Sequence, residues 1–437
     1  MFYLDRETEL DAKLLFKMIN KFRVDVEPRL NKYKNYYDGI QAILSKSYAD
    51  DSKPCSKTVI NYCRNIVDSY CGYLATPSFI SYNCDEDIED IMQILRYNDY
   101  QTEDAAFLLD ALIYGTAAEL MYIDAAAQTR FKLIKPTTCF GVYDDSLTND
   151  LLYFVRMYKA NEWDESNKYY LDVYSDYDIK HYTMSGATGL PVYIGSEPHH
   201  FGQCPANIFN MPDEKSIFDC IMSLQDAANE ILSSEIDDFN AFVDAYLILQ
   251  GVDAEPEDIA QMRQNRAASI PADATISYLT KAANDTQIEN MLKRIQDSIY
   301  RIAACPDFSS ESFVGGVSSG IAIQYRLTGM ETRAGNIEAL MKQALQRRVE
   351  IICGIATLKI GEDIFRDIEI TFKRNIPADT GAIVSMVNSL KGIVSDATLL
   401  SQIPFVADVN AELEALQEQK AANMALYSFG NDLGEED

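Results

Sequence analysis

The chain has 437 residues, of which 47% are hydrophobic, so it can bury a substantial core and contain about two to four substructures. Its 38 basic residues are outnumbered by 67 acidic residues, which gives a formal net charge of -29 at pH 7. This balance argues against a protein that binds nucleic acid tightly by neutralising phosphates, so any DNA partner must be one that slides.

Two patterns divide the first half of the chain. Residues 8–120 are predicted to be mostly helical, whereas residues 121–210 show the apolar and polar alternation that is typical of strands. Tyrosines are frequent in the second region, as in Leu151–Tyr158 and Lys168–Tyr174. Helical patterns return after residue 216, and no internal repeat is apparent. The sequence therefore predicts an α+β fold that is dominated by helices.

The stretch from Ser216 to Leu249 is predicted to be an amphipathic helix with one acidic and one apolar face. At about 100° per residue, five carboxylates fall within an arc of about 40°. They belong to Asp219, Asp226, Glu230, Asp237 and Asp244. In a monomer this acidic stripe is a solvated face. In a ring of such helices it becomes a stack of carboxylate rings along a channel or on its outer wall, which would keep a moving DNA duplex from sticking.

A short mixed segment is predicted to follow this helix. It contains a strand at Tyr246–Gly251, a helix at Pro256–Arg266 and a second strand at Thr275–Leu279. Two further helices are predicted to come after it.

The first of these helices is amphipathic and ends before Pro306. Its apolar residues recur at the helical period, at Ile288, Leu292, Ile295, Ile299 and Ile302. The basic residues Lys293, Arg294 and Arg301 lie on its other faces and are candidates for weak, transient phosphate contact. The alternative is pairing within the helix, because Glu289 and Asp297 lie four residues before Lys293 and Arg301.

A loop with five serines and three glycines runs from Cys305 to Gly320. Its composition makes a single ordered conformation costly, so this segment is expected to move. The second helix is predicted from Ile321 to Cys353, about 50 Å long, with weak points at Gly329 and Gly335. Taken alone, the three elements form an ordinary helix-loop-helix.

The remaining sequence predicts a strand at Asp367–Lys373 followed by helices, and a disordered acidic tail that ends in Gly434–Asp437. Arg347 and Arg348, with Lys342, are expected on a solvated or subunit-interface face. Nine cysteines without a Cys-x-x-Cys pair indicate buried thiols in a reducing cytoplasm. The N-terminus lacks the apolar core of a signal peptide, and no run of 18 apolar residues predicts a membrane span.

Catalytic patterns are missing from the sequence. His199 and His200 with Cys204 could supply metal ligands, but no fourth ligand has suitable spacing, so a turn at a strand edge is the favoured interpretation. The segment Gly315–Gly320 lacks the Gly-Lys-Ser/Thr ending of a phosphate-binding loop. We therefore expect no enzyme, no metal site and no cofactor.

The order of motifs resembles a known family. An amphipathic helix, the loop Pro306-Asp307-x-Ser309-Ser310-Glu311-x-x-x-Gly315-Gly316 and a long helix resemble the tunnel-loop region of tailed-bacteriophage portal proteins, the head-to-tail connectors of siphophage type. Further blocks occur in the family's order over about residues 30–425. They are Tyr36-Tyr37-Asp38-Gly39, Asn61 with Ile66-Val67-Asp68, Tyr73-Leu74 with Pro77, Gly115-Thr116-Ala117-Ala118-Glu119, Phe201-Gly202 with Pro205, Asn375 with Pro377, and Pro404-Phe405-Val406.

The resemblance implies the fold of a portal subunit, in which named regions follow one another along the chain. By position, the wing corresponds to residues 1–215 with 354–377, the two stem helices to 216–245 and 286–304, the clip to 246–285, the tunnel loop to 305–320, the long wing helix to 321–353, a small crown to 378–425 and an acidic tail to 426–437. The loop residues that would contact DNA are Asp307, Phe308, Ser309, Ser310, Glu311, Ser312, Phe313, Val314, Gly315, Gly316, Val317, Ser318 and Ser319. The crown is short beside larger relatives, so no role that needs a large C-terminal domain is expected.

The function implied by the resemblance is that of a ring, twelve-fold in assembled particles, at one vertex of the capsid in the virion. A separate terminase large subunit would drive double-stranded DNA through it, scaffold and major capsid protein would surround it in the host cytoplasm during assembly, and a head-completion (neck) protein would attach later. No membrane partner is expected. The alternative is an acidic cytoplasmic scaffold or adaptor that forms helical assemblies without threading DNA, and rings with a central hole in negative-stain images would discriminate the two.

Overall fold

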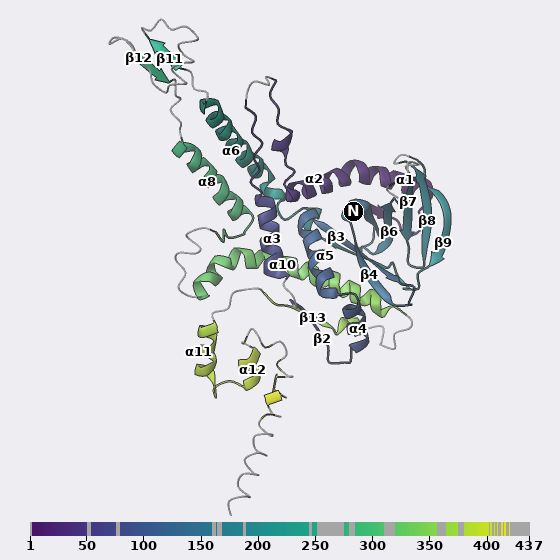
Figure 1. The fold of residues 1–437 in the computed structure, drawn as a ribbon. Helices are drawn as coiled ribbons and strands as arrows, with labels where there is room; N and C mark the ends of the chain where they lie inside the picture. Colours follow the sequence, from purple (N-terminus) through teal and green to yellow (C-terminus); the bar gives the residue numbers. More distant parts are fainter. Residues whose placement is uncertain are drawn as a thin grey trace, which may run out of the picture. The chain divides into compact units, whose positions relative to one another are not determined.

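The structure is a computed structural model of the 437-residue chain (Figure 1). It describes residues 2–49, 54–75, 79–159, 163, 168–186, 189–243, 247–250, 275–278, 285–309, 320–355, 364–374 and 380–401, with scattered positions up to 419. Helices and strands are mixed along the chain, which agrees with the predicted α+β class.

The chain forms two compact units. The first contains Met1–Pro306 and Gly329–Asn375, and the second contains Asp307–Thr328 and Ile376–Asp437. Both units are therefore discontinuous in sequence, and helix α10 (Gly320–Cys353) contributes residues to each of them.

A six-stranded sheet accounts for most of the strand-like region of the first unit. Its strand order is β1-β5-β6-β7-β8-β9, and every neighbouring pair is antiparallel except the parallel pair β1 and β5. The strands are β1 (Phe2–Leu4), β5 (Cys139–Asp144), β6 (Leu151–Tyr158), β7 (Lys168–Tyr174), β8 (Asp178–Ser185) and β9 (Val192–Pro198). The predicted strands at residues 151–158 and 168–174 are confirmed.

A second sheet of three antiparallel strands encloses the core with the first. Its order is β10-β3-β4, with β10 (Ala206–Asn210), β3 (Thr116–Ile123) and β4 (Thr129–Ile134). Ala118 and Leu120 of β3 form one buried cluster with Phe154 and Tyr174 of the larger sheet. The alternating apolar positions of both sheets therefore meet in a common core.

Helices of the N-terminal region begin and end at recognisable capping residues. Asp11 accepts a hydrogen bond from the backbone N–H of Leu14, and Gly39 adopts the left-handed conformation, φ 84°, that ends a helix readily. Asn61 caps the next helix by accepting from the N–H of Arg64. The helices are α1 (Ala12–Lys21), α2 (Glu27–Asp38), α3 (Tyr62–Leu74), α4 (Glu89–Tyr97) and α5 (Tyr100–Tyr114), with a π-helical turn at Phe22–Val26.

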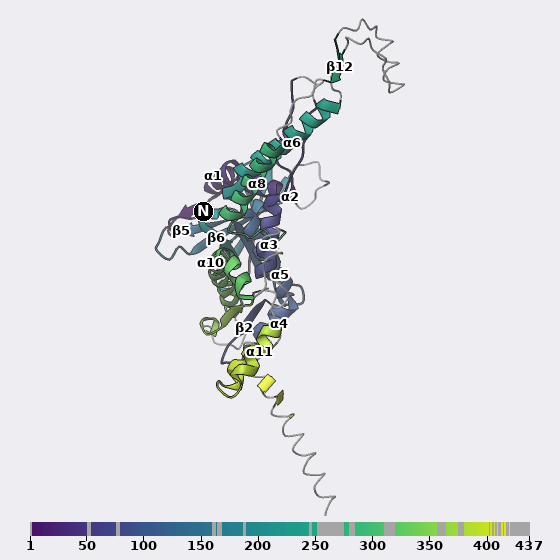
Figure 2. The same ribbon diagram turned by 90° about the vertical axis from the view of Figure 1, so that its left-hand side faces the viewer.

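Two helices with a hairpin between them follow in the sequence. Helix α6 (Met222–Val243) packs against α8 (Asp285–Ile302), and Figures 1 and 2 show the two side by side. The hairpin consists of β11 (Leu247–Gln250) and β12 (Thr275–Tyr278), which agrees with the two strands predicted there. The helix predicted at 256–266 lies outside the described residues.

The prediction of a continuous helix over 216–249 is wrong at both ends. A 3-10 turn at Asp219–Ile221 precedes α6, because the N–H of Asp219 bonds to the carbonyl of Ser216 in a tight turn. At the other end, α6 finishes at Val243 and the strand residues of β11 begin at Leu247.

The remaining elements follow the predicted order. Helix α10 covers the long helix expected at 321–353. Strand β13 (Glu369–Phe372) pairs antiparallel with β2 (Ile80–Asn83), and the C-terminal region contains α11 (Thr380–Leu390) and α12 (Asp396–Ser401). Among the described helices, none is long and apolar enough to cross a membrane.

Candidate functional site

The acidic stripe of α6 contacts the N-terminal region of its own chain. The hydroxyl of Tyr33 donates to Asp219 at 2.8 Å, and the hydroxyl of Tyr36 donates to Asp226 at 2.9 Å. Burial, together with these carboxylates, raises the pKa of both tyrosines. Glu230 forms a 2.9 Å ion pair with Lys46.

Asp237 lies in the most enclosed part of this contact. It is 8% exposed, and its Oδ1 accepts from the backbone N–H of Ser56 at 2.5 Å. The expectation that the stripe is a solvated face therefore fails at this position. Lysine at 237 would lose the acceptor and bury a second positive charge near Lys46. Asp244 lies outside the described residues. Whether any of these carboxylates faces DNA stays a prediction.

A row of polar side chains on α6, here called the polar ladder, binds residues 55–62, the segment that leads into α3. Gln225, Asn229, Ser233 and Asp237 accept hydrogen bonds from the backbone N–H groups of Tyr62, Ile60, Thr58 and Ser56 respectively. The four distances are 3.0, 2.9, 3.0 and 2.5 Å. Every fourth residue of a helix rises about 6 Å, and every second residue of an extended chain advances about 6.6 Å, so the two spacings match.

The polar ladder continues into the turn after α2. The amide of Asn229 donates to Gln41 at 2.5 Å, and Gln41 donates to Asn61 at 3.3 Å. Asn61 donates in turn to the carbonyl of Tyr37 at 2.9 Å. The sequence block of residues 36–39 and the capping residue Asn61 are therefore joined to α6 through buried amides.

The basic residues predicted on the amphipathic helix before Pro306, Lys293, Arg294 and Arg301, are exposed on α8. Among the described residues, no salt bridge joins Lys293 or Arg301 to the expected partners Glu289 and Asp297. These three cations are thus available to solvent, and their contact with phosphate stays a prediction.

Only the start of the predicted loop is described. The carboxylate of Asp307 accepts from the N–H of Ser309 at 3.0 Å and from its hydroxyl at 2.6 Å, and Phe308 is 42% exposed. The other predicted loop residues, Ser310, Glu311, Ser312, Phe313, Val314, Gly315, Gly316, Val317, Ser318 and Ser319, lie outside the described residues.

Helix α8 ends in a compact turn just before this loop. Ala304 has φ 51°, the N–H of Ala304 bonds to the carbonyl of Arg301, and the N–H of Cys305 bonds to the carbonyl of Tyr300. This pattern is a Schellman motif with alanine where glycine is usual. The carbonyls of Ala303 and Ala304 accept from the Tyr70 hydroxyl at 3.0 Å each. Sequence patterns give no sign of this left-handed alanine.

Arg333 of α10 bonds to the same turn. Its Nη1 donates to the carbonyl of Ala303 at 2.9 Å, and its Nη2 donates to the carbonyl of Ile217 at 2.7 Å. The guanidinium carbon lies 5.8 Å from the centre of the Tyr70 ring. The part of α10 around Arg333, the end of α8, the approach to α6 and helix α3 thus meet at one arginine.

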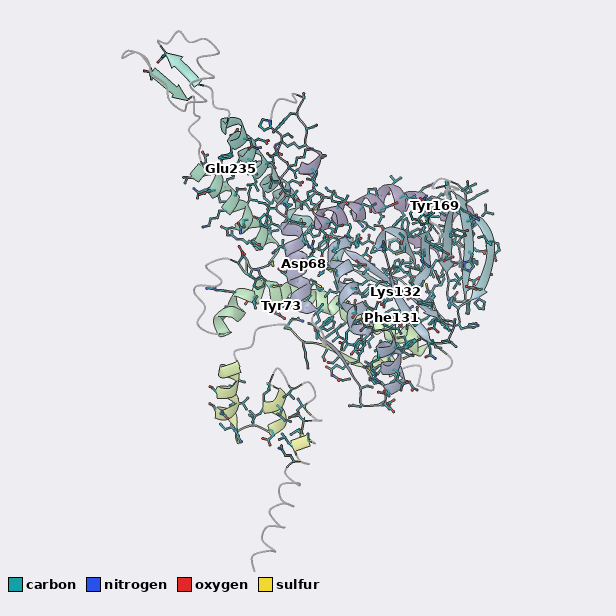
Figure 3. All side chains as sticks on the ribbon, viewed as in Figure 1. Asp68, Tyr73, Phe131, Lys132, Tyr169 and Glu235 are labelled. Carbon is teal, nitrogen blue, oxygen red and sulfur yellow. The ribbon has the colours of Figure 1, made fainter. Side chains whose placement is uncertain are left out.

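A second group of charges ties α10 to the chain after β13. Arg374 pairs with Glu338 at 2.6 Å and with Glu331 at 3.0 Å. The hydroxyl of Tyr73 on α3, a residue labelled in Figure 3, donates to Glu331. Burial opposes ionisation of Glu331, but Arg374 and Tyr73 nevertheless lower its pKa.

Arg348 is buried, so the expectation that it lies on a solvated or interface face is wrong. It forms a two-point ion pair with Glu119 of β3, at 2.8 and 2.7 Å, and a further pair with Asp104 of α5. All three side chains are 0% exposed. Its guanidinium carbon also lies 4.5 Å from the ring centre of Phe131 on β4. Figure 3 labels Phe131. Glu119 among the apolar residues of a strand was the available signal, since a buried carboxylate requires a partner.

His199 bonds to the backbone of its own chain on both sides of the ring. His199 accepts from the N–H of Phe201 at 3.2 Å, so its other ring nitrogen carries the proton and donates to the carbonyl of Ser175 at 3.1 Å. Burial lowers the pKa of His199, although the bond to Ser175 opposes this. Within the described part of the chain, no group of three or more histidine, cysteine or acidic side chains is arranged to hold a metal ion.

Comparison with known proteins gives two matches. The family model described as "Phage portal protein, SPP1 Gp6-like" matches residues 25–425. The portal protein of Bacillus phage SPP1 is 23% identical over 417 residues, a match that covers 89% of this chain and 80% of that protein. The matched range includes the paired helices, the loop and the long helix.

Proposed function

Because the chain belongs to the phage portal protein family, SPP1 Gp6-like, we propose that twelve copies form a closed ring at one capsid vertex through which double-stranded DNA is packaged and later ejected. Portal proteins of this family form the DNA-packaging channel. Within the ring, the wing, stem, clip, tunnel loop and crown take the residue ranges that the resemblance implies. The terminase large subunit, the scaffold or major capsid protein and the neck protein are the proposed partners.

The observation that carries this proposal, beyond the family match, is the incompletely covered face of α8. Ile299 is fully buried against the chain, but Met291 is 47% exposed and Ile302 is 48% exposed. On α6, Phe239 is 70% exposed. Apolar residues left open on a pair of packed helices are typical of surfaces that a further subunit covers.

Electron microscopy and native mass spectrometry of the purified full-length chain test the ring. We expect particles with a central hole, as a closed heterologous interface produces, and a mass of about ten to fourteen chains. A monomer that persists at micromolar concentration, or filaments without a hole, would instead support the acidic scaffold.

The loop assignment requires a separate experiment. Replacing Gly315 and Gly316 with alanine should stiffen the segment between α8 and α10 and lower the amount of DNA packaged per procapsid, while ring formation is retained. The matched control is Gly195→Ala, because a Cβ added at Gly195 meets nothing within 4 Å. Normal packaging by the double variant would mean that the loop is a passive connector.

A further inference from the structure

The end of α8 is held by two side chains that no local sequence pattern requires. A helix leaves its last four carbonyls without partners inside the helix, and the left-handed residue Ala304 turns the chain there. Two carbonyls at this turn, those of Ala303 and Ala304, accept hydrogen bonds from Tyr70, and the first also accepts from Arg333. The segment that begins at Asp307 starts three residues beyond this turn.

Arg333 suits this position because a guanidinium has several donors in a fixed plane. One Nη reaches the end of α8 and the other reaches the carbonyl of Ile217, just before α6. A lysine ammonium is a single compact group, so it can replace one of these bonds but not hold two separate carbonyls in the same geometry. The positive charge of Arg333 also complements the negative end of the α8 dipole.

Tyr70 completes the arrangement from α3. Its side chain is fully buried, and the two carbonyls of the turn share the single proton of its hydroxyl, each at 3.0 Å. Gly329, one helical turn before Arg333 on α10, brings that helix close to the turn as well, since a Cβ built at Gly329 would lie 3.9 Å from the Cβ of Ala304. Helices α3, α8 and α10 and the approach to α6 are therefore all bonded or packed to the turn at Ala304, the last through Arg333.

We propose that Arg333 and Tyr70 are positioning residues that fix the base of the loop and couple it to α10 and to the start of α6. We call the hydrogen bonds of Arg333 and Tyr70 to the carbonyls of Ile217, Ala303 and Ala304 the clamp. The role of the loop in DNA packaging rests on the proposed portal function, but the clamp is formed within a single chain. A displacement of α10 at Arg333 carries the carbonyls of Ala303 and Ile217 with it. Without the clamp, the two paired helices and α10 move independently.

Hydrogen exchange of the purified full-length protein, resolved by mass spectrometry, tests the clamp without DNA. In Arg333→Gln we expect amide exchange over residues 299–309 and 216–222 to be about tenfold faster, because a charged donor is lost from two carbonyls. Arg333→Lys should restore part of the protection at 299–309 and none at 216–222. Tyr70→Phe, which keeps the ring, should accelerate exchange at 299–309 alone.

The matched control is Arg347→Gln, the same substitution on the same helix, because Arg347 bonds to Gln203 and Glu350 and not to this turn. DNA packaged per procapsid is measured for each variant whose melting temperature matches the control. Local acceleration with reduced packaging in Arg333→Gln, partly rescued in Arg333→Lys, supports the proposal. Unchanged exchange, acceleration spread over the whole chain, or local acceleration with normal packaging overturns it. The portal function is contradicted if the unmodified protein forms no rings or packages no DNA. Hydrogen exchange tests the clamp independently of that outcome, because it needs neither rings nor DNA.

Discussion

Arg348, Asp104 and Glu119 place one positive and two negative side chains where no water reaches them. The Oδ2 atom of Asp104 and the hydroxyl of Tyr82 are buried nearby without a hydrogen-bond partner among the described residues. Tyr82 packs edge to face on Tyr100 of α5, so the cluster is enclosed by β2, β3, α5 and α10. Burial raises the pKa of the Asp104 carboxyl to about 6, although Arg348 opposes the shift. The cluster therefore holds a proton more readily than an exposed carboxyl does.

This gives a pH prediction at the scale of one residue. An unfolded aspartate has a pKa of about 3.9, so the raised value contributes stability that is present below about pH 4 and lost as pH rises through about 6. Asp104→Asn removes this dependence, and we expect the unmodified protein to lose stability relative to the variant between pH 4 and pH 7. Thermal unfolding across that range measures the difference. Asp145→Asn, at an exposed site, is the control, and parallel profiles for Asp104→Asn and the unmodified protein would contradict the expectation.

The long helices are the elements that the sequence predicted best. The amphipathic helix expected from the apolar period of Ile288 to Ile302 spans Asp285–Ile302, and the one expected at 321–353 spans Gly320–Cys353. Helical period and the stop at Pro306 are local signals, so they are readable without the fold. The contacts of α6 are not local: Tyr36 and Asp226 are 190 positions apart, and an acidic stripe looks the same in sequence whether it faces water or buried hydroxyls and N–H groups.

The polar ladder leads to a prediction at the scale of the element. Asn229→Ala leaves the N–H of Ile60 and the amide oxygen of Gln41 without a partner in a buried site, so it should lower the free energy of unfolding by about 1 to 3 kcal/mol. Chemical denaturation measures the loss. Asn240→Ala, an exposed asparagine on the same helix, should change stability by less than about 0.5 kcal/mol. Equal effects of the two substitutions would show that the ladder is not stabilising.

The net charge of -29 affects how copies of the chain associate. Identical copies of so acidic a chain repel one another, and salt screens that repulsion over about 10 Å at 0.1 M. The apolar residues left open on α6 and α8 are little affected by salt. Charge therefore opposes the proposed ring, and burial of apolar surface favours it.

We accordingly expect the fraction of chain in rings to rise as sodium chloride is raised from about 0.05 to about 0.5 M, because the screening length shortens by about threefold over this range. Sedimentation velocity at fixed protein concentration measures this fraction. Rings that dissociate as salt rises would show that ion pairs between neighbouring copies, and not apolar contacts, hold the interface. The expectation for α8 as a subunit-contacting helix would then be wrong.

In the polar ladder, the acceptors on α6 are spaced about 6 Å apart, and the N–H donors of residues 56–62 are spaced by a similar distance, at most about 6.6 Å. Sliding α6 by one residue rotates its side chains by about 100°, which moves all four acceptors away at once. The partly buried N–H groups of Ser56, Thr58 and Ile60 then lose their side-chain partners. Tilting α6 together with residues 55–62 breaks none of these bonds. The polar ladder therefore opposes rotation and sliding of α6 along its own axis. We expect α6 and residues 55–62 to tilt together as one rigid body.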